Sequence, residues 1–345
     1  MHLPVPRGPL STEVLGALAC DRPGGSFDAD TVLSLVAGLP SNVDPVTDDD
    51  FHLALWVMYE LAYRGFDEVD PEWEWDPELL RARRAFEVRF EAELRMRTSG
   101  YVEQARQSPG DVPDQLFALT ESMSGPSIAR HLQRHATPEQ FTEFMKQRSI
   151  YHLKESDPHS FVLPRLDGAA KVALAELQYD EYGGGRPARL HAAMFGDSLE
   201  AAGLDRAYGA YIDQVPGYTL AVNNAMSLLA LHRRLRAAAV GHLGAFEATS
   251  SLPCRRVAAG IRRLRLSETV AAYFDEHVEA DAVHEQLAFR DICGTIAAEE
   301  PDRIEDLFFG AAVCLYLDAV AGKEMIDAWE HGGSSLLASA EETVA

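Results

Sequence analysis

Two histidines and an aspartate at helical spacing form the pattern in this sequence that is best suited to bind a metal ion. The segment from residue 277 to residue 284 is HVEADAVH. On a helix with about 100° per residue, offsets of four and seven return to within about 40° and 20° of the start. His277, Asp281 and His284 therefore share one helix face. Two imidazoles and a carboxylate along one line suit iron, zinc or manganese, although a solvated face with incidental histidines is an open alternative.

One helix edge cannot complete a metal site, so further ligands must come from other segments. Glu181 directly precedes the glycine run at residues 183–185, and His191 follows ten residues after Glu181. The glycines allow a tight reversal of the chain that could bring both side chains together. Glu247 stands among small and apolar residues, and a buried carboxylate must be paired or bound to a metal. Glu155 is a further candidate carboxylate.

The candidates add up to four carboxylates and three histidines. They are Glu155, Glu181, His191, Glu247, His277, Asp281 and His284. Two iron ions need about that many protein ligands, whereas one zinc ion needs three or four. The set therefore favours a dinuclear site, provided that all seven side chains converge. No histidine follows a glutamate by three residues, so the Glu-x-x-His ligand pairs of ferritin-like bundles are excluded.

Other polar residues near these candidates have plainer interpretations. His152 and His159 flank Glu155 and could hold it by hydrogen bonds, but we expect them at the surface. Glu176 lies about 140° around the helix from Glu181 and is expected to face elsewhere. Arginines concentrate at residues 233–236, 255–256 and 262–265. Ion pairing within this acidic chain explains them, and binding of an anionic substrate or partner is the alternative.

Helices must position the candidate ligands, because helical periodicity dominates the chain and alternating Val/Ile/Thr-rich segments are scarce. The sequence therefore predicts an all-α fold. We expect helices over residues 49–66, 77–98, 137–155, 167–182, 186–202, 219–249, 267–298 and 301–321, of which 219–249 is one long helix or a kinked pair. A Pro/Gly-containing linker at residues 107–113 predicts a helical region over 1–110, a main domain over 111–330 and a tail over 331–345.

Composition and missing motifs exclude several classes of protein. The 345 residues include 54 acidic and 31 basic side chains, giving a net charge of −23, which argues against a general nucleic-acid binder. No apolar run is long enough to span a bilayer, and the N-terminus lacks signal-peptide order, so we expect a cytoplasmic enzyme. The P-loop, GxGxxG and CxxC patterns are absent. We therefore predict no nucleotide cofactor, and no catalytic residue beyond the metal ligands.

The order and spacing of the candidate ligands resemble those of the heme-oxygenase-like diiron oxidases and oxygenases, also described as iron-containing redox enzymes. In this order Glu155 is followed by Glu181, by His191 after nine intervening residues, by Glu247 and by the HVEADAVH block. The neighbouring segments KESDPH and ELQYDEYG also look like members of the family. The resemblance covers about residues 115–325, and the N-terminal region lies outside it.

The resemblance implies an all-α, heme-oxygenase-like bundle without heme, here with an N-terminal helical extension. It also implies two iron ions on the seven candidate residues, which react with O2 through a peroxo-diferric intermediate. Known reactions in the family are N-oxygenation of amines or guanidines, oxidative decarboxylation and C–C cleavage. Members that are N-oxygenases resemble this chain in having an additional upstream carboxylate, here Glu155, which favours N-oxygenation.

Several alternatives and partners follow from these expectations. Oxidative C–C cleavage or decarboxylation of an amino or fatty acid is the alternative at the same site. A mononuclear metal hydrolase and a non-catalytic helical binding protein are alternatives of other classes. The expected partners are a small-molecule substrate and an external electron donor or reductase, without nucleic acid or membrane. The fold is compatible with a homodimer, which the sequence does not specify.

Overall fold

A computed structural model describes residues 1–20, 27–40, 42–122 and 126–338, except for the side chains of residues 279–283. No strand occurs in these ranges and helices dominate them, so the predicted all-α fold is confirmed. The chain forms two compact units. Unit 1 comprises Met1–Arg97, Gly209–Asn224 and Leu336–Ala345, and unit 2 comprises Thr98–Tyr208 and Ala225–Ser335. The domain limits proposed at residues 110 and 330 stay a prediction.

Unit 1 is built from helices around an aromatic core. Its helices are α1 (Pro9–Leu18), α2 (Ala29–Ala37), α3 (Asp49–Glu60), the first part of α4 (Pro77–Gln107) and the start of α11 (Gly217–Leu231). The side chain of Asp48 caps α3 by accepting from the main-chain N–H of Phe51. Phe51, Trp56 and Phe86 are among its fully buried side chains. The helix predicted over residues 49–66 begins as expected and ends earlier, at Glu60.

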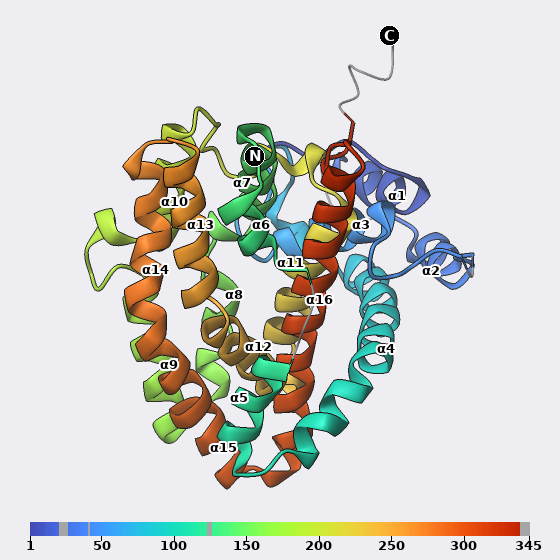
Figure 1. Ribbon diagram of the computed structural model, residues 1–345. Helices are drawn as coiled ribbons and strands as arrows, with labels where there is room; N and C mark the ends of the chain where they lie inside the picture. The colour runs from blue at the N-terminus through green and yellow to red at the C-terminus, as the bar shows by residue number, and fades with distance from the viewer. Residues whose placement is uncertain (21–26, 41, 123–125, 339–345) are drawn as a thin grey trace. The chain divides into compact units, whose positions relative to one another are not determined.

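Unit 2 contains most of the helices (Figure 1). After the end of α4 it comprises α5 (Val112–Ser122), α6 (Ile128–Arg134), α7 (Pro138–His152), α8 (Asp157–Ser160), α9 (Gly168–Glu181), α10 (His191–Ala201), the end of α11, α12 (Arg236–Ala248), α13 (Ser251–Arg263), α14 (Glu268–Gln286), α15 (Gly294–Glu299) and α16 (Ile304–Glu330). None of the helices in the described ranges combines the length and the apolar character that a bilayer span requires.

Helices α12 and α16 pack side by side in unit 2, and small residues allow their close approach. A Cβ atom on Gly310 of α16 would collide with the main chain of Ala238 in α12. Phe308 and Phe309 of α16 are almost completely buried. This close packing fixes the position of α12, which carries Glu247.

Two of the predicted long helices are interrupted in unit 2. The segment predicted over residues 219–249 is a kinked pair, in which a 3₁₀ turn at Arg233–Leu235 separates α11 from α12. The segment predicted over 267–298 changes from α14 to a π-helical stretch at Leu287–Cys293 before α15. Gly244 of α12 leaves room for the ring of Phe289 from this stretch. Such π segments are common at functional sites, and this one begins three residues after His284.

Candidate metal centre

Six of the seven predicted ligands lie close together inside unit 2. They are Glu155 in the turn after α7, Glu181 at the end of α9, His191 at the start of α10, Glu247 on α12, and His277 and His284 on α14. Each of the six is at most 5% exposed. The seventh, Asp281, falls in the stretch 279–283, whose side chains are outside the described part of the structure.

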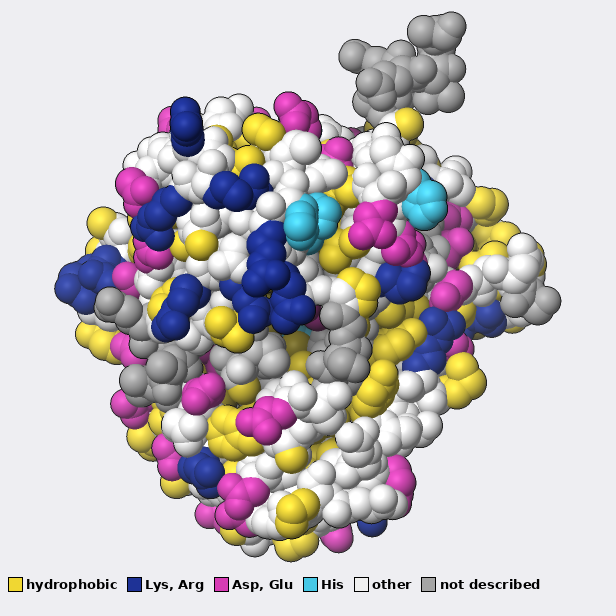
Figure 2. All heavy atoms as spheres, viewed as in Figure 1, with side chains coloured by type: hydrophobic (Ala, Val, Ile, Leu, Met, Phe, Trp, Pro, Cys, Tyr) yellow, Lys and Arg dark blue, Asp and Glu magenta, His cyan; other side chains and the backbone are white. Residues whose placement is uncertain are grey.

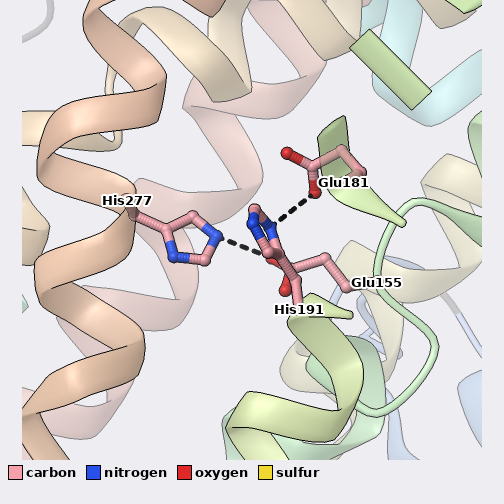
Figure 3. Close-up of side chains that lie close together, drawn as sticks. All are labelled: Glu155, Glu181, His191 and His277. Atoms are coloured by element: carbon pink, nitrogen blue, oxygen red, sulfur yellow. Dashed lines mark hydrogen bonds and ion pairs between the residues drawn. The ribbon is translucent and has the colours of Figure 1, made fainter. Parts of the chain in front are cut away.

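The six side chains form two groups that share one carboxylate. Glu155, Glu181, His191 and His277 offer ligand atoms that all lie within 4.8 Å of one another, and Glu181, Glu247 and His284 form a second such group. Figure 3 shows the four side chains of the first group pointing toward one another from separate elements. Glu181 is the residue that belongs to both groups.

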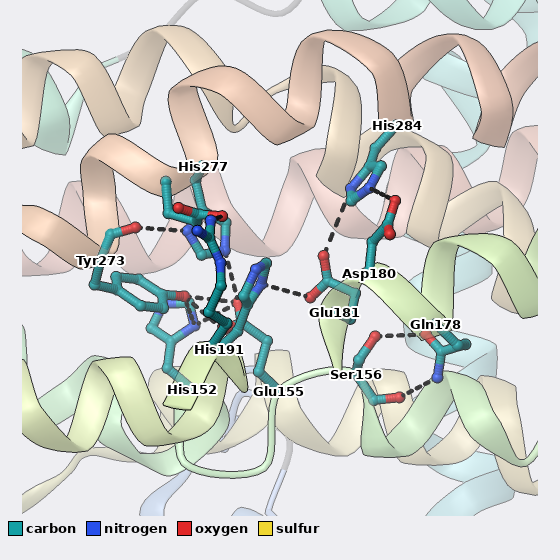
Figure 4. Close-up of polar contacts among 12 residues, drawn as sticks. His152, Glu155, Ser156, Gln178, Asp180, Glu181, His191, Tyr273, His277 and His284 are labelled. Atoms are coloured by element: carbon teal, nitrogen blue, oxygen red, sulfur yellow. Dashed lines mark hydrogen bonds and ion pairs between the residues drawn. The ribbon is translucent and has the colours of Figure 1, made fainter. Parts of the chain in front are cut away.

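Each oxygen of Glu181 faces a different histidine. Its Oε2 lies 3.1 Å from Nδ1 of His191, and its Oε1 lies 3.5 Å from Nδ1 of His284 (Figure 4). The carboxylate of Glu181 is thus held between two imidazoles, one on each side. Rotation of the Glu181 carboxylate would move Oε2 away from His191 or Oε1 away from His284.

The glycine run after α9 brings His191 back to Glu181. Gly183, Gly184 and Gly185 have φ angles of 81°, 58° and 76°, a conformation that L residues with side chains rarely adopt. A Cβ atom on Gly183 would lie only 2.5 Å from the carbonyl oxygen of Arg186. The tight reversal predicted from the sequence is therefore present, and it requires these glycines.

The two histidines of α14 are oriented by different hydrogen-bond partners. Nδ1 of His277 lies 2.8 Å from the carbonyl oxygen of Tyr273 and donates to it, while Nε2 faces Glu155 Oε1 at 3.6 Å. His284 is turned the other way, with Nε2 3.4 Å from Asp180 and Nδ1 toward the second group. Such contacts fix the tautomer and the ring orientation of a metal-binding histidine.

Glu155 is held by Tyr273, which the sequence analysis did not name, and by His152, which it expected at the surface. The Tyr273 hydroxyl lies 2.7 Å from both carboxylate oxygens and donates to them, and His152 Nδ1 lies 3.2 Å from Oε1. Burial raises the pKa of Glu155, but His152 and His277 lower it more, so it lies well below its usual value. Glu155 is thus kept ionised inside unit 2.

The expectation that His152 and His159 are surface residues is wrong, since both are buried. His152 is covered by Tyr273 and Phe195, whose rings pack against its own. Tyr273 precedes His277 by four residues and His152 precedes Glu155 by three. Helical spacing could therefore have placed both next to the predicted ligands.

A hydrogen-bonded clamp joins the turn that carries Glu155 to α9. Ser156, which has a left-handed φ of 67°, donates through Oγ to Gln178 Oε1 at 2.5 Å. Gln178 Nε2 donates back to the Ser156 carbonyl at 2.9 Å (Figure 4). It also donates to Ser160 Oγ at 2.7 Å. Gln178 precedes Glu181 by three residues on α9, so the clamp fixes Glu155 relative to Glu181.

The buried donor set fits a pair of iron ions. Three carboxylates share this interior, where burial raises the pKa of Glu247 and disfavours its charge. Burial lowers the pKa of His284, yet the neighbouring Glu247 and Glu181 raise it to about 9. The Nδ1 atom of His284 is buried and makes no hydrogen bond to the described residues. Buried anionic oxygens around an imidazole nitrogen suit a divalent or trivalent cation.

Comparison with known proteins gives a family match over the part of the chain that contains the centre. A family model described as iron-containing redox enzyme matches residues 142–319, which is more than half of the chain. The crystal structure of a CADD-like protein of unknown function from Nostoc punctiforme is similar with a TM-score of 0.50 and 18% identity, covering 63% of this chain and 96% of that chain. No curated protein matches the chain.

Proposed function

The chain belongs to the family of iron-containing redox enzymes, and on this basis we propose that it is a diiron oxygenase that N-oxygenates an amine- or guanidine-type small molecule. Its heme-oxygenase-like, all-α fold agrees with the resemblance that the sequence indicates. Membership of the family makes it an oxidoreductase, and the family and the buried Glu/His cluster are compatible with bound iron.

The observation that carries the proposal is the position of Glu181 between the two ligand groups. Its oxygens face His191 on one side and His284 on the other. A mononuclear zinc site needs only three or four ligands and would leave one of these groups without a role. Two metal ions that share Glu181 use both groups.

Each group would hold one iron. The first ion would be bound by Glu155, Glu181, His191 and His277, and the second by Glu181, Glu247, His284 and, from the sequence, Asp281. Bound there, two Fe(II) ions would supply two electrons for the reduction of O2. Tyr273 and His152 keep Glu155 ionised and oriented, and Asp180 orients His284.

N-oxygenation is favoured over the other reactions of the family by the additional carboxylate, Glu155. It adds an anionic ligand to the first group, and anionic oxygen ligands stabilise ferric iron. The overall reaction for a primary amine is R–NH₂ + O₂ + 2 e⁻ + 2 H⁺ → R–NHOH + H₂O. The two electrons that restore the ferrous state must come from an external donor.

An isotope experiment tests the reaction directly. The chain is titrated anaerobically with Fe(II), then mixed with ¹⁸O₂, ascorbate and a panel of amines and guanidines. We expect uptake of two Fe(II) per chain and a hydroxylamine or N-hydroxyguanidine that carries one ¹⁸O atom, detected by mass spectrometry. Release of CO₂ or an alkene would instead indicate decarboxylation or C–C cleavage. Tight binding of one ion with no O₂ consumption would contradict the proposal and favour a hydrolase or a binding protein.

We also propose a cytoplasmic location for the enzyme. The buried cysteines Cys293 and Cys314 form no disulfide, which is typical of proteins in reducing compartments. A homodimer, with which the fold is compatible, stays a prediction.

A further inference from the structure

Basic side chains gather on one face of unit 2, although the chain as a whole has a net charge of −23. Helices α6 and α13, with residues 264–265 that follow α13, contain seven arginines and no acidic residue. These arginines, which we call the arginine face, are Arg130, Arg134, Arg255, Arg256, Arg262, Arg263 and Arg265. Figure 2 shows dark blue side chains concentrated over this part of the molecule.

Two members of the arginine face have structural roles. Arg262 forms ion pairs with Glu268 at 2.7 Å and with Asp275 at 2.6 Å. Arg263 donates to main-chain carbonyls at the end of α6, including that of Leu132 at 3.0 Å. Ion pairing within the chain therefore explains Arg262, and helix capping explains Arg263.

The other five arginines need a different explanation. Arg130, Arg134, Arg255, Arg256 and Arg265 form no ion pair with the residues that the structure describes, and all but Arg256, which is half-buried, are exposed. Arg265 has a φ of 59°, a left-handed conformation that glycine adopts at much lower cost. The fold thus holds Arg265 in a strained conformation, and the described residues provide no ion pair for it or for the other four arginines.

The arginine face lies one helix away from the metal centre. Helix α13 packs along α14, which carries His277 and His284. Ser251 at the start of α13 donates to the carbonyl of Val278, the residue after His277. A molecule bound to α13 therefore has a short path through α14 to the proposed iron ligands.

We infer that the arginine face docks an acidic one-electron carrier protein that reduces the iron centre. The inference rests on the proposed function, because N-oxygenation consumes two electrons from outside the chain in each turnover. Two reduced carriers each lose one electron, one O₂ is reduced, one oxygen atom forms the N–O bond and the other leaves as water with two protons. Complementary charge supplies orientation and a fast encounter for such a transient partner.

A small acidic protein suits this face better than a larger polyanion does. The field of the arginines is screened beyond about 10 Å at moderate ionic strength, so only a partner seated on the face itself experiences it. A nucleic acid or an anionic membrane extends farther and would also meet the acidic surface of the chain. The arginine face is thus matched to a compact acidic partner.

The test compares two double variants with the same change in charge. The variant Arg130→Glu/Arg255→Glu reverses the charge of two side chains of the arginine face. Both lie near the N-terminus of their helix, where a carboxylate is tolerated. Lys171→Glu/Arg233→Glu is the control, because both residues are exposed, belong to unit 2 and lie outside the face. The probe is an acidic plant-type [2Fe–2S] ferredoxin. Its Kd for the full-length chain and its rate of oxidation during amine turnover are measured at low and high salt.

We expect the variant of the arginine face to bind ferredoxin at least about tenfold more weakly at low salt and the control to change less than about twofold. Turnover with ascorbate should be equal in all three proteins. Equal ferredoxin affinity in all three proteins, or tighter binding of a DNA duplex than of ferredoxin, would overturn the inference. If no donor supports amine-dependent O₂ uptake, the proposed function fails, and the Kd values still decide whether the arginine face binds the carrier.

Discussion

His52 in unit 1 and His284 in unit 2 are both buried histidines, and their ring nitrogens meet different partners. Nε2 of His52 donates to the carbonyl oxygen of Pro45 at 2.9 Å, and its Nδ1 accepts from Asn224 Nδ2 at 3.1 Å. Nδ1 of His284 instead lies 3.4 Å from a carboxylate oxygen of Glu247. One imidazole thus has two neutral partners, whereas the other is turned toward an anion.

The pKa values of the two histidines move in opposite directions. Burial lowers the pKa of His52 to about 3, so the ring stays neutral and acts as a rigid polar connector. Burial also lowers the pKa of His284, but the surrounding carboxylates raise it to about 9. A histidine that is only buried, such as His52, is neutral and structural. A buried histidine that faces carboxylates, such as His284, lies at a site that favours a cation. Metal binding is expected only where that second condition holds.

Replacement of Glu181 by alanine should have the largest effect, because this carboxylate belongs to both ligand groups. By analogy with structural zinc sites of four ligands, which contribute about 10–16 kcal/mol, one shared ligand is worth about 2.5–4 kcal/mol for each ion. We expect the Glu181→Ala chain to lose both irons at micromolar Fe(II) and to keep its helical circular dichroism. Iron content per chain, measured by atomic emission, checks this.

Glu176→Ala is the matched control, since Glu176 is an exposed glutamate on the same helix. It should bind the same amount of iron as the wild type. Loss of one iron only from Glu181→Ala, with the second retained at full affinity, would show that Glu181 does not bridge.

Replacement of His52 by alanine should affect stability and leave iron binding unchanged. The variant loses two hydrogen bonds, leaves the Asn224 amide without this partner and creates a cavity in unit 1. We expect a loss of about 3 kcal/mol in the free energy of unfolding. Urea denaturation measures this loss, and the iron stoichiometry at 10 °C should equal that of the wild type. A fall in iron content without destabilisation would contradict the conclusion that His52 is structural and that only His284 belongs to the metal centre.

Acid should reduce the stability that His52 contributes, and this effect should be smaller than that of replacing His52 by alanine. Its pKa of about 3 in the folded chain lies below the value of about 6.5 in unfolded chains. The unfolded state therefore binds the extra proton first, and stability is lost as the pH falls from about 6.5 toward 3. At pH 5 this contribution is about 2 kcal/mol relative to pH 7. The difference in unfolding free energy between wild type and His52→Phe should shrink by that amount, and a constant difference would contradict the assignment.

Helical spacing was sufficient to predict much of the fold and the neighbourhood of the centre. Local sequence patterns predict three of these features because each depends on contacts within a short segment. They are the position of α9, the glycine reversal and the shared face of His277 and His284. The π-helical stretch after α14 was not predicted. It depends on Phe289 packing into the space at Gly244, a contact between segments far apart in the sequence.

Burial was harder to predict than spacing. His152 stands between Tyr151 and Leu153, just before the polar segment KESDPH, and its burial was not predicted. It is buried because Phe195 of α10 and Tyr273 of α14 cover it, and no local pattern in α7 indicates those helices. The clamp between Ser156 and Gln178 was missed for the same reason. The ligand roles of the centre, including that of Asp281, stay a prediction.

Two tyrosine-to-phenylalanine variants give the finest test of the comparison, because each unit contains a buried tyrosine that donates to a carboxylate. The Tyr273 hydroxyl donates to Glu155 at 2.7 Å, and that of Tyr59 donates to Glu87 at 3.3 Å. Loss of a hydrogen bond to a metal-binding carboxylate typically weakens metal affinity by about 10–100-fold. We expect Tyr273→Phe to weaken the affinity for one iron by about tenfold and to leave the affinity for the other unchanged. A biphasic Fe(II) titration resolves the two. Tyr59→Phe should not alter either phase, since Glu87 belongs to neither ligand group. If Tyr273→Phe weakened both irons equally, Glu155 would act on the whole centre, and the division into two groups joined by Glu181 would have to be abandoned.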